Sequence, residues 1–414
     1  MTERHAFPVL LALVLALTSL WGAGAQTESN ATWTAWLFNA NSNALVSVSL
    51  DGAVRTFVLP LMEGTYLYSY PTFSSDGGLA AYCVSDTQGN STLYVRDIFA
   101  EANLVDHALG KVAGCSTGPA AFNEEATQVA VGVLNDYPGD PNADADRPSW
   151  ELLVMALPSG EVVSRLDADT PALAGLDLMA DFSQMGFMPM VQRFWSGQIA
   201  FAVMPWAVGG PPEVDGVVWD LATGAVSAVE PYGKVGLDIL AATGEMIWLD
   251  TDESFPLGEP LPGPAPTFNV VMYGGAPGQQ QVIFTEPMVL GRARFVDDGR
   301  RVAVHAVGAY DEQTGTAPAG WVAFDRRGAV EALPPELSDY NLVAAPGGFA
   351  ILHTAYQGDA YTNPLTALRH YRFVEGEGVA YTALWEDPTD AWLILWSPPI
   401  AAAADRPAFA GVAP

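Results

Sequence analysis

The sequence is poor in basic residues, and this shortage limits the partners that we expect. Its 414 residues include 17 lysines and arginines against 47 aspartates and glutamates, and the only lysines are Lys111 and Lys234. The formal net charge of −30 therefore comes from missing cations rather than from acidic blocks. Because phosphate backbones and anionic headgroups repel such a surface, we exclude nucleic acid as a partner.

Cysteine is almost absent as well. The two cysteines are Cys83 and Cys115. In an oxidising compartment an even pair is more often bridged than free, so we expect a disulfide between them. Two buried, inert thiols are the alternative.

Long apolar runs are missing, with one exception at the start of the chain. Residues 9–20 read VLLALVLALTSL, after Arg4 and before small residues that end at Ala25. This pattern is typical of a secretory signal peptide, and it is too short for a comfortable membrane span of about 20 residues. We expect residues 1–25 to be cleaved, leaving a secreted or periplasmic protein without a membrane span. An uncleaved anchor is the alternative.

Helical periodicity is missing from nearly all of the remaining chain, and two strand–turn–strand signals recur in its place. The first falls at 73–82, 122–131, 194–203, 240–249, 295–304 and 344–352, with turn centres roughly 50 residues apart. The second, a hairpin with glycine near its turn, falls at 49–54, 157–162, 220–226, 324–330 and 374–379, with weaker versions near Ala100 and Gly278. Four strands in each period is the pattern of a β-propeller blade.

The turn counts predict an all-β propeller with seven four-stranded blades; six or eight blades are the alternatives. Seven turns of the second kind stand against six of the first. The difference disappears if the strand at 390–397 joins the N-terminal strands and closes the ring, which removes exposed sheet edges. We expect one domain over residues 26–399. The Ala/Pro-rich tail 400–414 is expected to be disordered.

Two of the repeats resemble those of a known family. The segments YPTFSSDGGLAAY (70–82) and RARFVDDGRRVAV (292–304) have an aromatic residue, a polar pair, Asp-Gly and a short apolar strand. They resemble the repeat of TolB-like periplasmic β-propellers. The resemblance implies an exported propeller that binds other proteins or acts as a scaffold. It implies no functional residues, because the matching positions form a structural turn.

The longest insertions lie between the second and third strands of five successive blades, and we expect them on one face. They cover residues 135–148, 205–216, 250–266, 308–320 and 356–364. Long loops on a rigid scaffold often carry function, and aromatic rings among carboxylates suit a protein or glycan partner. The candidate ligand residues are Tyr137, Trp206, Asp252, Glu253, Tyr310, Tyr356 and Tyr361. The alternative is that these loops merely cap the blades.

One insertion has the spacing of a calcium loop. Oxygen-bearing side chains occupy alternate positions, and a glutamate stands at the twelfth. The candidate ligands are Asp140, Asn142, Asp144, Asp146 and Glu151. Calcium is the one cofactor that the sequence suggests. Ala145 stands where an EF-hand has glycine, so a solvated acidic loop is the alternative.

No catalytic motif stands out. The letters GCSTG at 114–118 match a nucleophile elbow, but Pro119 follows and no helix is expected there. We therefore favour a monomeric, non-enzymatic binding or scaffold module of the cell envelope. The alternative is a propeller-type glycan hydrolase or lyase that uses channel-mouth carboxylates such as Asp238 and Asp390.

Overall fold

Nearly all of the regular structure is antiparallel β-strand, which confirms the all-β class. The structure is a computed structural model, and it describes residues 33–135, 147–176, 187–205, 215–234, 236–241, 243–251, 268–273, 280–286, 289–307, 319–334, 337, 342–356, 364–375, 378–400 and 402–410. All of the strands belong to the compact unit Thr34–Pro414. The predicted signal peptide, residues 1–25, lies outside the described residues. Within those ranges no helix has the length and apolar character needed to cross a membrane.

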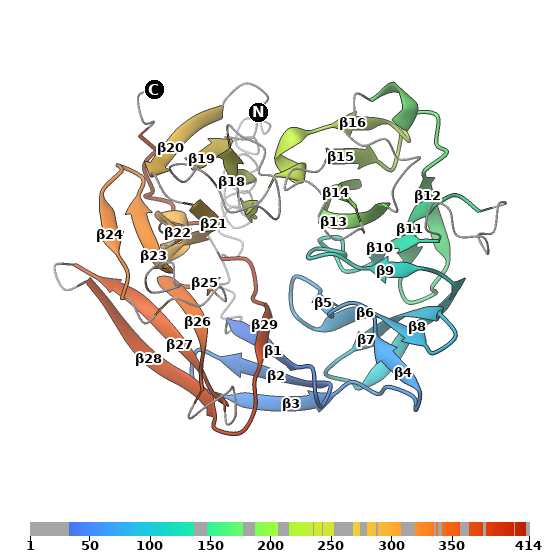
Figure 1. Ribbon diagram of the computed structural model, residues 1–414, viewed down its shortest axis with the longest axis horizontal. Coiled ribbons are helices and arrows are strands. Elements are labelled where there is room, and N and C mark those ends of the chain that lie inside the picture. The colour runs from blue at the N-terminus through green and yellow to red at the C-terminus, as the bar shows by residue number, and fades with distance from the viewer. Residues whose placement is uncertain are drawn as a thin grey trace, which may run out of the picture. The chain divides into compact units, whose positions relative to one another are not determined.

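The described strands form seven antiparallel sheets, which we number 1 to 7 in chain order (Figure 1). Sheet 1 contains β29 (Leu393–Trp396), β1 (Thr34–Asn39), β2 (Ala44–Ser49) and β3 (Val54–Val58). Sheet 2 contains β4 (Thr65–Leu67), β5 (Thr72–Phe73), β6 (Leu79–Asp86), β7 (Asn90–Asp97) and β8 (Ala102–Lys111). Sheet 3 contains β9 (Gly114–Ser116), β10 (Gln128–Leu134), β11 (Trp150–Ala156) and β12 (Val162–Asp167).

The other four sheets each take four consecutive strands of the chain. Sheet 4 contains β13 (Phe187–Trp195), β14 (Gln198–Pro205), β15 (Asp215–Asp220) and β16 (Val226–Ala228). Sheet 5 contains β17 (Asp238–Leu240), β18 (Glu245–Thr251), β19 (Phe268–Tyr273) and β20 (Gln280–Glu286). Sheet 6 contains β21 (Val289–Val296), β22 (Arg301–Val307), β23 (Ala319–Asp325) and β24 (Val330–Ala332). Sheet 7 contains β25 (Leu342–Ala345), β26 (Gly348–Tyr356), β27 (Pro364–Val374) and β28 (Gly378–Asp387). Short 3-10 turns occur at η1 (Leu173–Gly175), η2 (Glu230–Gly233) and η3 (Asp297–Gly299).

Burial along the strands follows their order within a sheet. The inner strands β10 and β11 of sheet 3 are each buried at six of their seven positions, whereas the outermost strand β12 alternates. Both faces of the inner strands are covered, because apolar clusters fill the space between neighbouring sheets. This explains why these strands read as continuous apolar runs rather than as an alternating pattern.

Sheets 3 and 4 approach so closely that only glycine fits at one contact. A Cβ atom at Gly132 of β10 would lie 1.8 Å from the carbonyl oxygen of Pro189 on β13. No side chain can occupy that space, so this glycine is required by packing between sheets.

Sheet 1 combines the two ends of the described strands. β29 pairs with β1 through Trp36↔Trp396, Leu37↔Ile394 and Phe38↔Leu393, with a register shift after the first pair. Figure 1 shows the two strands side by side, β29 in red and β1 in blue. The number of blades and the closure of the ring stay predictions.

The sequence predicts a disordered tail over residues 400–414, and two side chains of its described part pack against the rest of the protein. Ile400 and Phe409 are buried in the apolar cluster that also contains Leu240, Phe284 and Phe324 from sheets 5 and 6. The sequence of the tail has no strand or helix pattern, and its described residues form neither strand nor helix. Two apolar anchors in an Ala/Pro-rich stretch nevertheless bury enough surface to hold it.

Candidate functional site

A cavity of about 1030 Å³ opens between the first strands of several sheets. Its walls come from β1, β4, β5, β9, β13, β21 and β29, together with the segment that links β4 to β5. Binding sites for small molecules are commonly about 300–1,000 Å³. The volume therefore suffices for a ligand or for several side chains of a partner protein.

Three alternating tyrosines form one wall of this cavity. Tyr66, Tyr68 and Tyr70 come from β4 and the segment that follows it. Tyr66 and Tyr70 are 49% and 56% exposed, which is high for aromatic side chains. The ring of Tyr70 also contacts Phe38 of β1 edge-on, with the ring centroids 5.8 Å apart. Exposed aromatic rings at a concave site are typical of binding surfaces.

Tyr68 anchors this wall to the two sheets behind it. Its backbone N–H donates to the carbonyl of Cys83 on β6 at 2.9 Å, and its hydroxyl donates to the carbonyl of Ala113 at 2.7 Å. Further along, the hydroxyl of Thr72 donates to the carbonyl of Pro119 at 3.2 Å. The segment that carries the exposed rings is thus fixed before any partner arrives, which lowers the entropic cost of binding.

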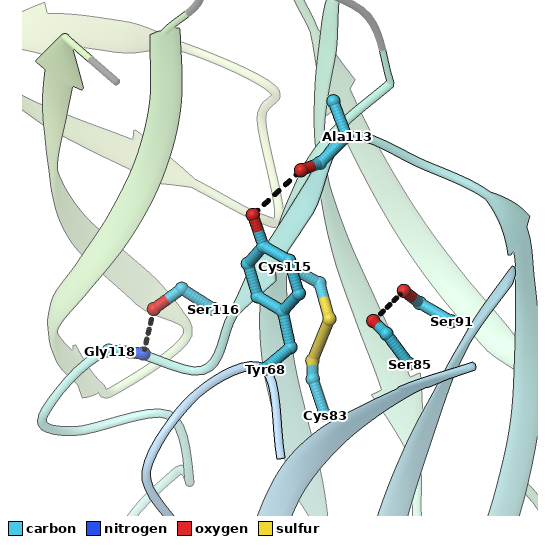
Figure 2. The surroundings of a disulfide bond; sticks show 8 residues. All are labelled: Tyr68, Cys83, Ser85, Ser91, Ala113, Cys115, Ser116 and Gly118. Carbon is cyan, nitrogen blue, oxygen red and sulfur yellow. Dashed lines mark hydrogen bonds between the residues drawn. A yellow bond between two sulfur atoms is a disulfide. The ribbon is translucent and has the colours of Figure 1, made fainter. Parts of the chain in front are cut away.

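A disulfide joins the same two sheets directly behind the tyrosine wall. Cys83 of β6 and Cys115 of β9 are bridged, with their Cα atoms 6.3 Å apart, and both are fully buried. Figure 2 shows the ring of Tyr68 beside the bridge, and the hydroxyls of Ser85 and Ser91 hydrogen-bonded to each other on the far side. Cys115 also lines the cavity, so the bridge is part of its wall.

The charge of the cavity differs from that of the whole protein. Arg292 of β21 is the only charged side chain among the described residues that line it. That lining contains no carboxylate, no histidine and no free thiol, because Cys115 is bridged. It therefore holds no pair of carboxyl groups of the kind that glycoside hydrolysis needs.

The GCSTG motif forms part of the cavity wall and has the geometry of a strand and turn. The hydroxyl of Ser116 accepts the backbone N–H of Gly118 at 3.1 Å (Figure 2). Gly118 has φ of +65°, and a Cβ there would lie 2.3 Å from the carbonyl oxygen of Val191. The glycine thus serves close contact with β13, and no helix follows the serine as an elbow requires.

The aspartates of the two repeat motifs hold turns. In the first motif Asp76 accepts the hydroxyl of Ser74 at 2.6 Å and the N–H of Gly78 at 2.9 Å. Burial alone would raise the pKa of Asp76, but these hydrogen bonds outweigh it and hold the pKa below its usual range. In the second motif burial raises the pKa of Asp297, although Arg300 and Arg301 oppose the shift.

Most of the ligand residues predicted from the sequence lie outside the described residues. These are Tyr137, Trp206, Asp252, Glu253, Tyr310 and Tyr361. Tyr356 is described only as the last residue of β26. The cavity residues Tyr66, Tyr68 and Tyr70 were missed, although their alternation in TYLYSYP (65–71) is a visible signal.

Of the predicted calcium ligands, only Glu151 is described. It is a buried residue of β11, with its Oε2 atom 3.9 Å from Nε of Arg165 on β12. Asp140, Asn142, Asp144 and Asp146 lie outside the described residues, where the calcium site stays a prediction. Elsewhere in the described chain, no group of three or more acidic, histidine or cysteine residues could hold a metal ion.

The two carboxylates of the enzyme alternative are engaged in local structure. Asp238 of β17 accepts the backbone N–H of Phe295 at 2.7 Å. Asp390 accepts the side-chain amide of Asn41 at 3.3 Å and the backbone N–H of Ala391 at 2.9 Å. Neither residue lines the cavity described above.

Comparisons with known proteins give structural likeness only. No family model and no curated protein matches the sequence. The β-propeller domain of the Trilobed protease from Pyrococcus furiosus is 14% identical, with a TM-score of 0.45 over 84% of this chain and 91% of that domain. TolB from Acinetobacter baumannii is 12% identical, with a TM-score of 0.42 over 87% of this chain and 65% of TolB.

A third similar structure is the acylaminoacyl peptidase from Pyrococcus horikoshii. It is 11% identical, with a TM-score of 0.44 over 86% of this chain and 53% of the peptidase. The chain thus spans about half the length of that enzyme. At these identities the matches assign no function.

Proposed function

We propose that this protein is a non-enzymatic binding module that takes up a segment of a partner protein in the tyrosine-walled cavity. The observation that supports this most directly is the pair of exposed rings, Tyr66 and Tyr70, on a wall fixed by hydrogen bonds and a disulfide. Rigid aromatic side chains at a concave site are the usual energetic centres of protein interfaces.

The rest of the lining fits an apolar segment of a protein better than it fits a sugar. Met188 and Met190 of β13 and Ile394 and Leu395 of β29 face the same cavity. Methionine adapts its shape to varied partners. A sugar site with hydrolytic activity would need carboxylates, which the described lining lacks.

We further propose that the seven sheets are the seven blades of one propeller, closed where β29 joins β1, in an exported protein. The pairing of these strands and the disulfide support this proposal. Deletion of residues 390–397 tests the closure, because it should expose the edge of β1 and cause aggregation. A deletion variant that stays monomeric with an unchanged melting temperature would show that β29 does not close the propeller ring.

The binding proposal is tested with peptides selected from a random display library against the purified protein. Calorimetry then compares the wild type with Tyr66→Ala and Tyr70→Ala, which we expect to weaken binding at least about tenfold because they remove central aromatic contacts. Tyr381→Ala is the matched control, since Tyr381 is 56% exposed on β28 and does not line the cavity.

Equal affinity of all variants for every selected peptide would place binding elsewhere and overturn the proposal. A panel of oligosaccharides incubated with the wild type tests the alternative activity. If the wild type cleaves an oligosaccharide and the Tyr66→Ala variant cleaves it equally well, the function is enzymatic and depends on carboxylates outside this cavity.

A further inference from the structure

The chain does not end at β29 but continues across the turns of sheets 5 and 6. We call residues 397–410 the C-terminal strap. Two backbone hydrogen bonds fix it to sheet 6: the N–H of Ala403 donates to the carbonyl of Asp298 at 2.9 Å, and that of Ala410 donates to the carbonyl of Arg326 at 2.7 Å. The strap is therefore attached by its backbone at its middle and at its C-terminal end.

The strap is held by buried side chains as well. Ile400 and Phe409 are 7% and 6% exposed, inside the apolar cluster of sheets 5 and 6. The guanidinium carbon of Arg326, a fully buried residue, lies 4.3 Å from the centre of the Phe409 ring. Arg406 of the strap approaches Glu245, with 3.4 Å between Nε and Oε2. These contacts bury apolar and charged groups together, so the strap is part of the core at this point.

β29, by contrast, has few backbone pairs of its own, although Leu395 and Trp396 pack against the apolar cluster of sheets 1 and 2. It is four residues long, none of them fully buried, and it pairs with β1 at three positions across a register shift. A central pair such as β10 and β11 has seven matched positions. Yet Ile394 and Leu395 of β29 are part of the cavity wall. This wall strand is thus weakly held by its own sheet.

The joint between β29 and the strap is short and stiff. Ser397, Pro398 and Pro399 separate Trp396 from the buried Ile400. Proline fixes φ, so two consecutive prolines form a stiff link, and the position of Ile400 restricts the position of Trp396. Anchoring Ile400 in sheets 5 and 6 therefore confines Trp396 to the neighbourhood of β1 and raises its effective concentration there.

From these contacts we infer that the C-terminal strap is a tether that keeps β29 paired with β1, so that undocking of the strap from sheets 5 and 6 releases one wall of the cavity. The strap and the cavity are thereby coupled through a single covalent segment. This inference does not rest on the proposed function, because it concerns the position of β29 whatever the cavity binds.

Hydrogen–deuterium exchange of the full-length protein tests the tether. We compare the wild type with the double variant Arg406→Ala/Phe409→Ala and with a chain that ends at Pro399. Amides of β29 and of its partner strand β1 should exchange at least about tenfold faster in both variants, while β10 and β11 keep their protection and report an intact fold. The matched control is Asp405→Asn, which removes only a surface ion pair with Arg300, since Asp405 is 76% exposed. Its exchange in β29 should equal that of the wild type.

A synthetic peptide of residues 400–414, added to the chain that ends at Pro399, separates tethering from simple packing. The peptide can make the contacts of Ile400 and Phe409 with sheets 5 and 6 again but has no covalent link to β29. We expect it to slow exchange at the turns around Gly299 and Arg326 and to leave β29 unprotected. Restored protection of β29 by the free peptide, or unchanged protection of β29 without the strap, would overturn the tether. If the shortened chain loses protection in β10 and β11, it is no longer folded, and the exchange of β29 in the double variant then decides whether the strap is a tether.

Discussion

The buried charge cluster of sheets 5 and 6 gives a quantitative prediction for the exchange Glu245→Gln. Arg326 is fully buried, and its two terminal nitrogens donate to the carboxylate of Glu245 at 3.1 and 2.8 Å. Its remaining bonds go to the carbonyls of Gly299 and Pro407, which carry no net charge. Glutamine keeps the size of the side chain but removes the compensating charge.

The cost follows from leaving a buried guanidinium without its counter-ion. Removing one partner of a buried ion pair costs about 3–5 kcal/mol. Because the side chain of Glu245 is 20% exposed, we expect the lower end, about 3 kcal/mol. The unfolding entropy of a chain of this length corresponds to a shift of roughly 1 °C per kcal/mol, so the midpoint should fall by about 3–4 °C.

The matched control is Glu331→Gln. Arg301 and Glu331 form the same kind of pair at 2.8 Å, but their side chains are 26% and 28% exposed. Such a pair contributes about 0–1 kcal/mol. Urea unfolding of both variants measures the difference. If Glu245→Gln costs no more than Glu331→Gln, burial of Arg326 does not determine the strength of the cluster.

The same cluster predicts a dependence of stability on pH. Burial alone would raise the pKa of Glu245, but the hydrogen bonds and charges of Arg326 and Arg406 outweigh it and hold the pKa below its ordinary value of 4.5. The folded protein therefore keeps this carboxylate ionised at pH values where the unfolded chain takes up a proton. Its contribution is complete well above pH 4.5 and is lost as the pH falls through the lowered value. The slope of unfolding free energy against pH below 4.5 should be shallower in Glu245→Gln.

Three more predictions concern other parts of the molecule. Replacing Cys83 and Cys115 by serine should lower the free energy of unfolding by about 3–4 kcal/mol, as the chain-entropy model gives for a separation of 32 residues. An unfolding midpoint of the wild type that does not change when reductant is added would contradict this prediction. Gly132→Ala should lose about 1–3 kcal/mol or more, since its Cβ would overlap the carbonyl of Pro189; a variant as stable as the wild type in urea would refute this contact. Burial lowers the pKa of His370, so the folded state binds fewer protons than the unfolded state and stability should fall as the pH drops below about 6.5. His370→Gln should remove that part of the pH profile, and an unchanged profile would assign it to another group.

The sequence predicted the strands better than it predicted the site. The turn signals at 73–82 and 194–203 fall between strands that pair in the structure, and the signal at 122–131 is closed by an isolated bridge between Phe122 and Val129. Polar turns between apolar segments act locally, so the sequence shows them. The turn at Asp76 and Ser74 is also local, since its hydrogen bonds span only a few residues. The tyrosine wall was missed because its neighbours in space, such as Met188 and Ile394, are far away in sequence.

The amino-acid sequence by itself determined the all-β class, the alternation of turns and the pairing chemistry of two cysteines, because each depends on residue type and short-range spacing. Tertiary structure alone decided that the tail is docked. Ile400 and Phe409 are two apolar residues in a stretch of alanine and proline, and only the cluster between sheets 5 and 6 gives them something to bury against. Likewise, Arg326 looks like a surface turn residue until Glu245, 81 positions earlier, is brought within hydrogen-bonding distance. Long-range contacts of this kind leave no periodic trace in a sequence, because folding of the whole chain creates them.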